Sequence, residues 1–207
     1  MLGRRSKRRA LLRTTRRTSP NRPRRGLLFH HFLICRQSNA KDVPMTDSTA
    51  LIESLLARVE LLEDKLAITE LLTTYSPAVD SGSADEVANL WLEDGVYDVD
   101  TGAMHGRGEL RAMVHSASHQ NWIMNGAAHM MTPAHIRIDG NKAVATCHSQ
   151  LVIKDPENPT GFKVLRITAN RWELIKTDGE WKVELRTNAL LDGRPEARAL
   201  LAAGVTA

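Results

Sequence analysis

The sequence has little cysteine and no long hydrophobic run. Cys35 and Cys147 are the two cysteines among 207 residues, too few for a disulfide framework or a cysteine-rich zinc site. The longest apolar stretch, Leu27–Cys35, is interrupted by two histidines and is nine residues long, whereas a membrane-spanning helix needs roughly 20. We therefore expect a soluble, cytoplasmic protein that does not bind a membrane.

Motifs for nucleotide and acyl-enzyme chemistry are also absent. The sequence contains no Gly-rich phosphate loop and no Gly-x-Ser-x-Gly elbow. His115 and His119 stand four residues apart in a predicted helix, but no Glu follows His115 and no third ligand is evident. We expect neither a cofactor nor a bound metal.

Acidic residues are almost missing from the first 44 residues. This segment carries 13 Lys and Arg and one acid, Asp42, for a net charge of +12, whereas residues 45–207 carry 15 basic and 23 acidic side chains, for −8. Clustered arginines without apolar periodicity cannot bury enough surface to offset the entropy of ordering. We expect residues 1–44 to be a basic, disordered extension and residues 45–207 to be the folded domain.

Several roles are open for this extension. Its arginine clusters fit a transit peptide, a twin-arginine export signal at Arg24 and Arg25, or an arm that binds a polyanion. Aromatic residues for base stacking are lacking, so we do not expect a nucleic-acid partner. Because composition changes at Met45, we favour the interpretation that the extension is dispensable or precedes the true translation start.

The first part of the domain shows helical periodicity. Apolar residues recur at helical spacing from Leu51 to Leu66, and Leu55–Leu66 approaches a heptad pattern. Fewer than two heptads are too short for an independent coiled coil, so we interpret this helix as packed on its own domain or on a dimer partner. A second helix is predicted over Ile68–Val79, which Pro77 must kink or end.

Two shorter helices and a strand are predicted next. A helix opens at Ser83 with Trp91 facing inward, Val96–Asp100 is a short strand, and a third helix runs from Glu109 to about His119.

From residue 128 onward the apolar period changes to two. Turn residues, including Asp-Gly pairs typical of hairpins, bound four runs: Ala128–Ile138, Ala143–Ile153, Phe162–Thr177 and Glu180–Leu190. Helices followed by such runs predict an α+β fold, in which a curved antiparallel sheet wraps around the N-terminal helices and leaves a pocket. We expect a C-terminal helix from residue 195 to close the open end.

Polar residues at apolar-looking positions are the candidates for chemistry. They are Tyr75, Asp80, His129, His148, Arg166 and Asn170. A buried carboxylate costs several kcal/mol unless it is paired, so Asp80 needs a partner, and a carboxylate–histidine pair suits proton transfer. From spacing alone, a structural role is the commoner one for both members, with Asp80 holding a turn and His129 in the core.

Several segments, in their order and spacing, resemble the SnoaL-like family over roughly residues 50 to 190. They are Leu71–Asp85, Leu92–Tyr97, Gly106–Leu110, Ala128–Met130, Ile138–Gly140 and Asp178–Val183. This family shares a cone-shaped α+β barrel with scytalone dehydratase, bile-acid 7α-dehydratase, ketosteroid isomerase and nuclear transport factor 2. The resemblance implies the same cone for this chain.

The resemblance also implies a catalytic set of His129, Asp80 and Tyr75. In the dehydratase members a Tyr precedes the Asp by five residues, and a His at the start of the first long strand is the general base that this Asp orients. Asn170 resembles an Asn that binds substrate. Lys154 departs from the family, because relatives place a second catalytic His or Asp there.

The direction of His129 depends on an irregular strand. Strict alternation puts His129 on the opposite face from Ile136 and Ile138, so we predict a bulge at Pro133. Further substrate contacts are expected from His148, Trp91, Trp122 and Met131, with Met124 and Met130 as additional apolar walls.

These observations predict a cofactor-independent lyase of the dehydratase type. It would eliminate water or a similar leaving group from a small, apolar, hydroxylated ring compound such as a steroid or polyketide. An isomerase or cyclase is the alternative, since the same base would serve, although no acid stands at His148, Gln150 or Val152 to favour it. A ligand-binding or assembly module with the Leu55–Leu66 seam as its contact is a third possibility. We expect a homo-oligomer, either a dimer or a trimer.

Overall fold

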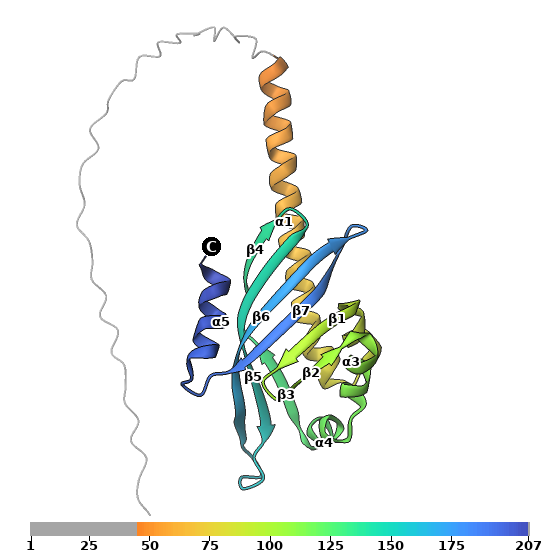
Figure 1. Cartoon of the computed structure of the whole chain (residues 1–207), viewed down its shortest axis with the longest axis vertical. Coiled ribbons are helices and arrows are strands. Elements are labelled where there is room, and N and C mark those ends of the chain that lie inside the picture. Colours follow the sequence, from red (N-terminus) through yellow and green to blue (C-terminus); the bar gives the residue numbers. More distant parts are fainter. Residues whose placement is uncertain (1–44, 207) are drawn as a thin grey trace, which may run out of the picture. The chain divides into compact units, whose positions relative to one another are not determined.

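The computed structural model describes residues 45–206 (Figure 1). The basic extension predicted for residues 1–44 lies outside this part of the chain, and so do the roles considered for it. The described elements are α1 (Met45–Asp80), α2 (Ala84–Asn89), β1 (Trp91–Val99), β2 (Gly102–His105), α3 (Gly106–His115), α4 (Ala117–Asn125), β3 (Ala127–Met131), β4 (His135–Asp139), β5 (Lys142–Lys154), β6 (Phe162–Thr177), β7 (Glu180–Leu190) and α5 (Pro195–Val205). Within residues 45–206 no helix has the length and hydropathy to span a membrane.

The two helices predicted at the start of the domain form the single helix α1. Pro77 does not end the helix, because α1 continues to Asp80. Pro77 lies in the last turn, where its missing N–H removes one intrahelical hydrogen bond. Few helical residues follow it, so a bend at this point would change the direction of only a short segment. As a result Asp80 is the last residue of a 36-residue helix.

The N-terminal half of α1 projects beyond the sheet (Figure 1). Leu55, Leu62 and Leu66 are 47%, 65% and 59% exposed, whereas Ile68 is fully buried. The apolar residues of this segment therefore do not pack on their own domain up to Leu66, and the helix enters the core at Ile68.

The strands form one curved sheet whose concave face covers the C-terminal half of α1. Its order is β2-β1-β7-β6-β5-β3, with β4 also paired to β5. Every pair is antiparallel except β1 with β7, which is parallel. The predicted α+β cone is thus confirmed, with one parallel pair that the prediction of an antiparallel sheet lacked.

Segments around the first strand differ from the prediction. The short helix stops at Asn89, and Trp91 begins a strand instead of ending a helix. Strand β1 is irregular between Trp91 and Val96, where its pairing with β7 shifts register. Gly95 lies so close to β7 in this segment that a Cβ atom would be 2.7 Å from the Val183 carbonyl oxygen. The predicted third helix is two helices, α3 and α4, separated at the extended residue Ser116.

The irregular strand predicted near Pro133 is confirmed. The run from residue 127 to 139 is split into β3 and β4, and both pair with β5. Three residues, Thr132 to Ala134, lie between the strands, opposite two residues of β5, Cys147 and His148. The extra residue shifts the inward–outward alternation of side chains by one position, so that His129 faces the interior like Ile136 and Ile138.

The C-terminal helix α5 does not close the open end of the cone as predicted. It packs on the outer face of β5, β6 and β7 (Figure 1), where Gly204 lies directly over the Thr146 side chain. Thr146 points away from Ala145 and Cys147, which belong to the core cluster on the concave side. Helix α5 therefore covers the convex face of the sheet.

The close approach at Gly95 yields a stability prediction. Gly95→Ala places a methyl group 2.7 Å from the Val183 carbonyl oxygen and 2.9 Å from Trp91 Cδ1, so we expect unfolding free energy to fall by about 1–3 kcal/mol. The matched control is Gly108→Ala in α3, where the methyl group meets nothing within 4 Å. That change should raise stability by about 0.5–1 kcal/mol. Denaturant unfolding measures both, and an equal effect of the two changes would contradict the packing at Gly95.

Candidate functional site

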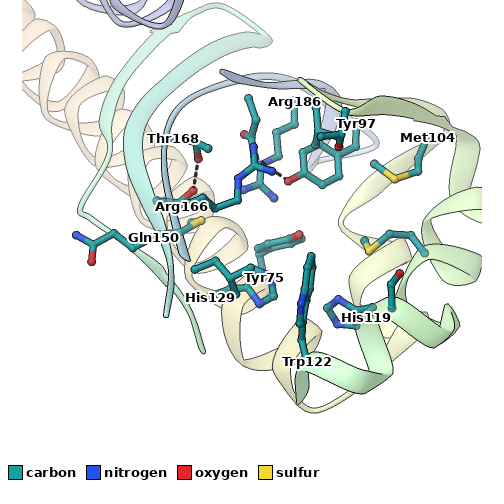
Figure 2. A pocket seen from close by; sticks show the side chains of 18 of the residues that line it. Tyr75, Tyr97, Met104, His119, Trp122, His129, Gln150, Arg166, Thr168 and Arg186 are labelled. Carbon is teal, nitrogen blue, oxygen red and sulfur yellow. Dashed lines mark hydrogen bonds between the residues drawn. The ribbon is translucent and has the colours of Figure 1, made fainter. Parts of the chain in front are cut away.

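A cavity of about 270 Å³ lies between the helices and the concave face of the sheet (Figure 2). Its lining includes four residues predicted for the site, Tyr75, His129, Trp122 and Met131, and the candidate Arg166. It also includes residues that the sequence analysis did not select, among them Tyr97, His119, Arg186 and Asn188. Side chains from α1, α4, β3, β6 and β7 therefore meet in one space.

Asp80 and His129 are in direct contact at one wall of the cavity. Asp80 Oδ1 accepts a hydrogen bond from His129 Nδ1 at 2.6 Å, and Asp80 Oδ2 accepts one from the backbone N–H of His129 at 2.8 Å. The two side chains are 22% and 20% exposed. Because the Nδ1 proton points to the carboxylate, Nε2 of a neutral His129 carries the free lone pair. The arrangement makes His129 a base in a fixed tautomer.

A second histidine supports the first. His119 is 3% exposed, and its ring stacks on the His129 ring with centroids 5.6 Å apart and planes at 30°. His119 Nε2 donates to the carbonyl oxygen of Val79 at 3.0 Å, which is the residue before Asp80. His119 thus ties α4 to the end of α1 and holds the His129 ring from the side.

His129 also borders a groove on the other side of β3. Met131 lines both spaces too, and residues of α1 and the β3–β4 connection complete the groove: Thr69, Leu72, Thr73, Ser76, Met130, Thr132, Pro133 and Ala134. His129 therefore borders both the cavity and this outer groove.

The opposite wall is built around a buried arginine. Arg186 on β7 is 2% exposed, and its guanidinium lies 4.2, 4.4 and 4.0 Å from the ring centroids of Tyr75, Tyr97 and Trp172. Its Nε and Nη2 donate to Asn170 Oδ1 at 3.1 and 2.8 Å. Aromatic faces and an amide oxygen stabilise this cation, and none of these partners carries a negative charge.

One nitrogen of Arg186 is left without a partner. Within the described part of the chain, Nη1 is buried and makes no hydrogen bond, and the same is true of Asn188 Oδ1. Both side chains line the cavity. Neither atom has surface open to the cavity, so what Arg186 offers a bound molecule is its positive charge close behind the wall, which favours an electron-rich oxygen at this end.

Tyr97 completes the polar end. Its hydroxyl accepts a hydrogen bond from Asn188 Nδ2 at 2.8 Å. Burial raises the pKa of Tyr97, the Arg186 charge opposes this rise, and interaction with Tyr75 adds to it. The Tyr97 hydroxyl is therefore a neutral hydrogen-bond donor over the ordinary pH range.

Arg166 is neutralised by a neighbour. It pairs with Asp100 at the mouth of the cavity. The two arginines of the lining thus differ: Arg166 has a carboxylate partner, whereas Arg186 has none within residues 45–206.

Three residues predicted to bind substrate do not line the cavity. Asn170 is fully buried, and its amide is engaged by Arg186, Ser149 and Thr168. Its role is to hold Arg186 from behind.

Trp91 and His148 are the other two. Trp91 is fully buried in the aromatic core beside Tyr75, because it starts a strand that passes under the cavity. His148 is exposed on the outer face of β5, since its neighbours Cys147 and Ser149 face inward. Of the additional methionines, Met130 borders only the outer groove, and Met124 is 81% exposed.

No metal site is evident in this part of the chain. Residues 45–206 contain no group of three or more His, Cys, Asp or Glu side chains placed to hold an ion. His115 and His119 are separated by the break at Ser116 and lie on different helices.

The sequence analysis missed Arg186 because β7 changes parity. Trp181 and Val183 face inward, and strict alternation would then turn Arg186 outward. Glu184 is skipped in the pairing with β6, where Leu174 pairs with Val183 and Glu173 with Leu185. The sequence did contain a signal: Arg186 and Asn188 stand two residues apart, so they share one face of the strand and place polar groups together on it.

Burial of Tyr97 predicts a delayed ionisation. The chain has two tyrosines, so Tyr75→Phe leaves Tyr97 as the sole phenol. Its phenolate absorbance should appear at higher pH in the native protein than in the unfolded chain, which ionises near the ordinary pKa of 10.0. Stability that depends on Tyr97 is complete below pH 10 and is lost as pH rises further, because the unfolded chain releases the proton first. Tyr97→Phe should lack this loss in denaturant titrations. Equal ionisation of native and unfolded chains would contradict the burial.

Comparison with known proteins places this geometry in a family. The SnoaL-like domain matches residues 60–187. An NTF2-like protein with a cystatin-like fold from Novosphingobium aromaticivorans is 39% identical, with a TM-score of 0.68 over 71% of this chain and 94% of that one.

More distant structures share the fold. A protein of unknown function from Mycobacterium tuberculosis is 23% identical, with a TM-score of 0.58 over 70% of this chain and 86% of that one. A hexachlorocyclohexane dehydrochlorinase from Novosphingobium barchaimii is 17% identical, with a TM-score of 0.56 over 66% of this chain and 96% of that one. No curated protein matches the chain with significance. The family match over residues 60–187 and the 39% identity to the Novosphingobium aromaticivorans protein show that the chain belongs to the SnoaL-like family.

Proposed function

We propose that the protein is a cofactor-independent lyase that eliminates water, or a similar leaving group, from a small and largely apolar ring compound. The observation that carries this proposal is the placement of a histidine base and an unpaired buried cation in one cavity. His129 is oriented by Asp80, and Arg186 stands on the opposite wall. Such a pair can remove a proton and stabilise the negative charge that forms.

The first step is proton abstraction. His129 Nε2 takes a proton from the carbon next to a carbonyl group, and the C–H electron pair moves into an enolate. Asp80 keeps its hydrogen bond to Nδ1 and stabilises the imidazolium, as a carboxylate does in other histidine-based sites. The positive charge of the buried Arg186 stabilises the enolate oxygen, and the Tyr75 hydroxyl is the hydrogen-bond donor.

The second step releases the leaving group. The enolate electrons return to form a carbon–carbon double bond, and the bond from the β-carbon to the hydroxyl oxygen breaks. The imidazolium of His129 gives its proton to that oxygen, and water leaves. The enzyme is then back in its starting state, so neither an oxidant nor a cofactor is consumed.

The cavity favours a flat, apolar substrate with a polar group at one end. Trp122, Met104, Met113 and Met131 supply apolar contacts, whereas Arg186, Asn188 and Tyr97 gather at the polar end. A hydroxylated cyclic ketone, as found in steroids and polyketides, has this distribution. The dehydrochlorinase among the structural neighbours is named for an elimination from a ring compound, which supports the same class of reaction.

Substitutions in the dyad test the base. His129→Ala and Asp80→Asn should each lower turnover of a β-hydroxyketone panel by about 10²- to 10⁴-fold, with little change in the far-UV spectrum. The matched control is His148→Ala, a histidine on the outer face of the adjacent strand, which should keep full activity. Normal turnover by His129→Ala would remove the dyad from the mechanism.

A second prediction concerns the cation. Arg186→Met should lower turnover by about 10²- to 10³-fold, while binding of a substrate analogue without the carbonyl group changes little. Arg166→Met removes a cation that already has a carboxylate partner, so its effect on turnover should be smaller. Equal losses in the two variants would argue against a specific role for Arg186.

Product analysis distinguishes the alternatives. Release of water with formation of a conjugated double bond identifies elimination, whereas a product of unchanged mass identifies an isomerase or cyclase using the same base. Tight binding of the ketone panel without any conversion identifies a ligand-binding module.

A further inference from the structure

The exposed half of α1 carries an apolar seam with the spacing of a coiled coil. Assigning a and d positions by the alternate three- and four-residue spacing gives Ile52, Val59 and Leu66 at a, and Leu55, Leu62 and Thr69 at d. The five apolar members are between 47% and 65% exposed. β-Branched residues at the first two a positions with leucine at d favour two parallel strands.

Charged residues beside the seam agree with this geometry. Arg58 and Lys65 occupy g positions, and Glu63 and Glu70 occupy the following e positions. In a parallel, in-register pair of helices, each g residue lies near the e residue five positions later in the other helix. Arg58 then faces Glu63 of the second copy, and Lys65 faces Glu70.

The same charges oppose an antiparallel arrangement. Antiparallel helices bring g beside g and e beside e, so any charged pair between the copies would join two of the basic residues at g or two of the acidic residues at e. Like charges that face each other are destabilising. Seam and flanking charges thus select one orientation.

The folded domain leaves the seam free. The side of α1 that enters the core carries Ile68 at position c, and Asp64 at position f accepts a hydrogen bond from Trp181 and pairs with Lys176. Positions c and f lie on the side of the helix away from a and d. Figure 1 shows this half of α1 extending past the sheet, so a second helix can lie along it without meeting the strands.

The helix is already formed before it associates. An isolated segment of this length would pay for helix nucleation, but here α1 continues into the packed domain and is anchored at Ile68. The cost that makes two heptads inadequate for a free peptide is therefore reduced by preorganisation.

We propose that the chain forms a homodimer through a parallel coiled coil of residues 52–69 of α1. From Thr69 onward the same face of the helix borders the groove with β3, so the paired segment ends there. The family match begins at residue 60, and the first part of the seam lies before it.

Substitution in the seam tests the contact in the full-length protein. Sedimentation equilibrium should give a dimer, and Val59→Glu should raise its dissociation constant roughly 10- to 100-fold by placing two carboxylates in the seam. Ala57→Glu adds the same charge at the exposed f position and should leave the dimer intact. Circular dichroism checks that both variants remain folded, which is expected because Val59 is 48% exposed.

Charge exchange tests the orientation. One variant combines Arg58→Glu with Lys65→Glu, and a second combines Glu63→Lys with Glu70→Lys. Each alone places like charges across the parallel pair and should be mainly monomeric, whereas an equal mixture should form heterodimers. A monomeric wild type, an oligomer that Val59→Glu leaves unchanged, or a mixture that does not associate would each overturn the proposal.

Discussion

The double hydrogen bond between Asp80 and His129 holds the site together. One carboxylate oxygen binds the backbone of β3 and the other binds the imidazole, so the end of α1 is fixed to the strand that carries the base. The same contact sets the tautomer of His129 and the position of the helix in the cone. His119 reinforces it from α4 by bonding Val79 and stacking on His129. Local structure and chemistry therefore depend on one side chain at a helix terminus.

The opposite wall holds a buried cation, Arg186, among apolar side chains. Burying a charge without a counter-ion costs several kcal/mol, and the fold offsets this with three aromatic faces and the amide of Asn170. One Nη1 donor is still unused. A protein selected only for stability would gain from an apolar residue there, so retention of the arginine is consistent with a requirement imposed by a ligand.

Much of the architecture could be predicted from periodicity and turn residues. The change from helical to alternating spacing near residue 128 located the sheet, and the conflict between His129 and Ile136 correctly required an irregular strand at Pro133. Tyr75, Asp80 and His129 stood out as polar residues at apolar-looking positions, and the family resemblance made them the catalytic set. Tyr75 and His129 line one cavity, and Asp80 is hydrogen-bonded to His129.

The errors have a common physical cause. Pro77 was judged by its local effect, although its place in the last turn makes it harmless. Trp91 and His148 were assigned to the cavity from residue type and Asn170 from the family resemblance, whereas side-chain direction depends on where each strand starts and where its register shifts. Arg186 was missed for the same reason, because the pairing skips Glu184.

That skipped residue determines the chemical character of the cavity. Upstream of Glu184 the inward face of β7 carries Trp181 and Val183, and downstream it carries Arg186 and Asn188. If Glu184 were instead paired in regular register, strict alternation from Val183 would turn Leu185 and Thr187 inward in place of Arg186 and Asn188. The sheet would keep its order and its pairing partners, while the cation would be transferred to the outer face. A register shift of one residue is thus enough to replace a cation in the cavity wall by an uncharged side chain, so members of one fold can differ in chemistry without any change in the identity of the surrounding side chains.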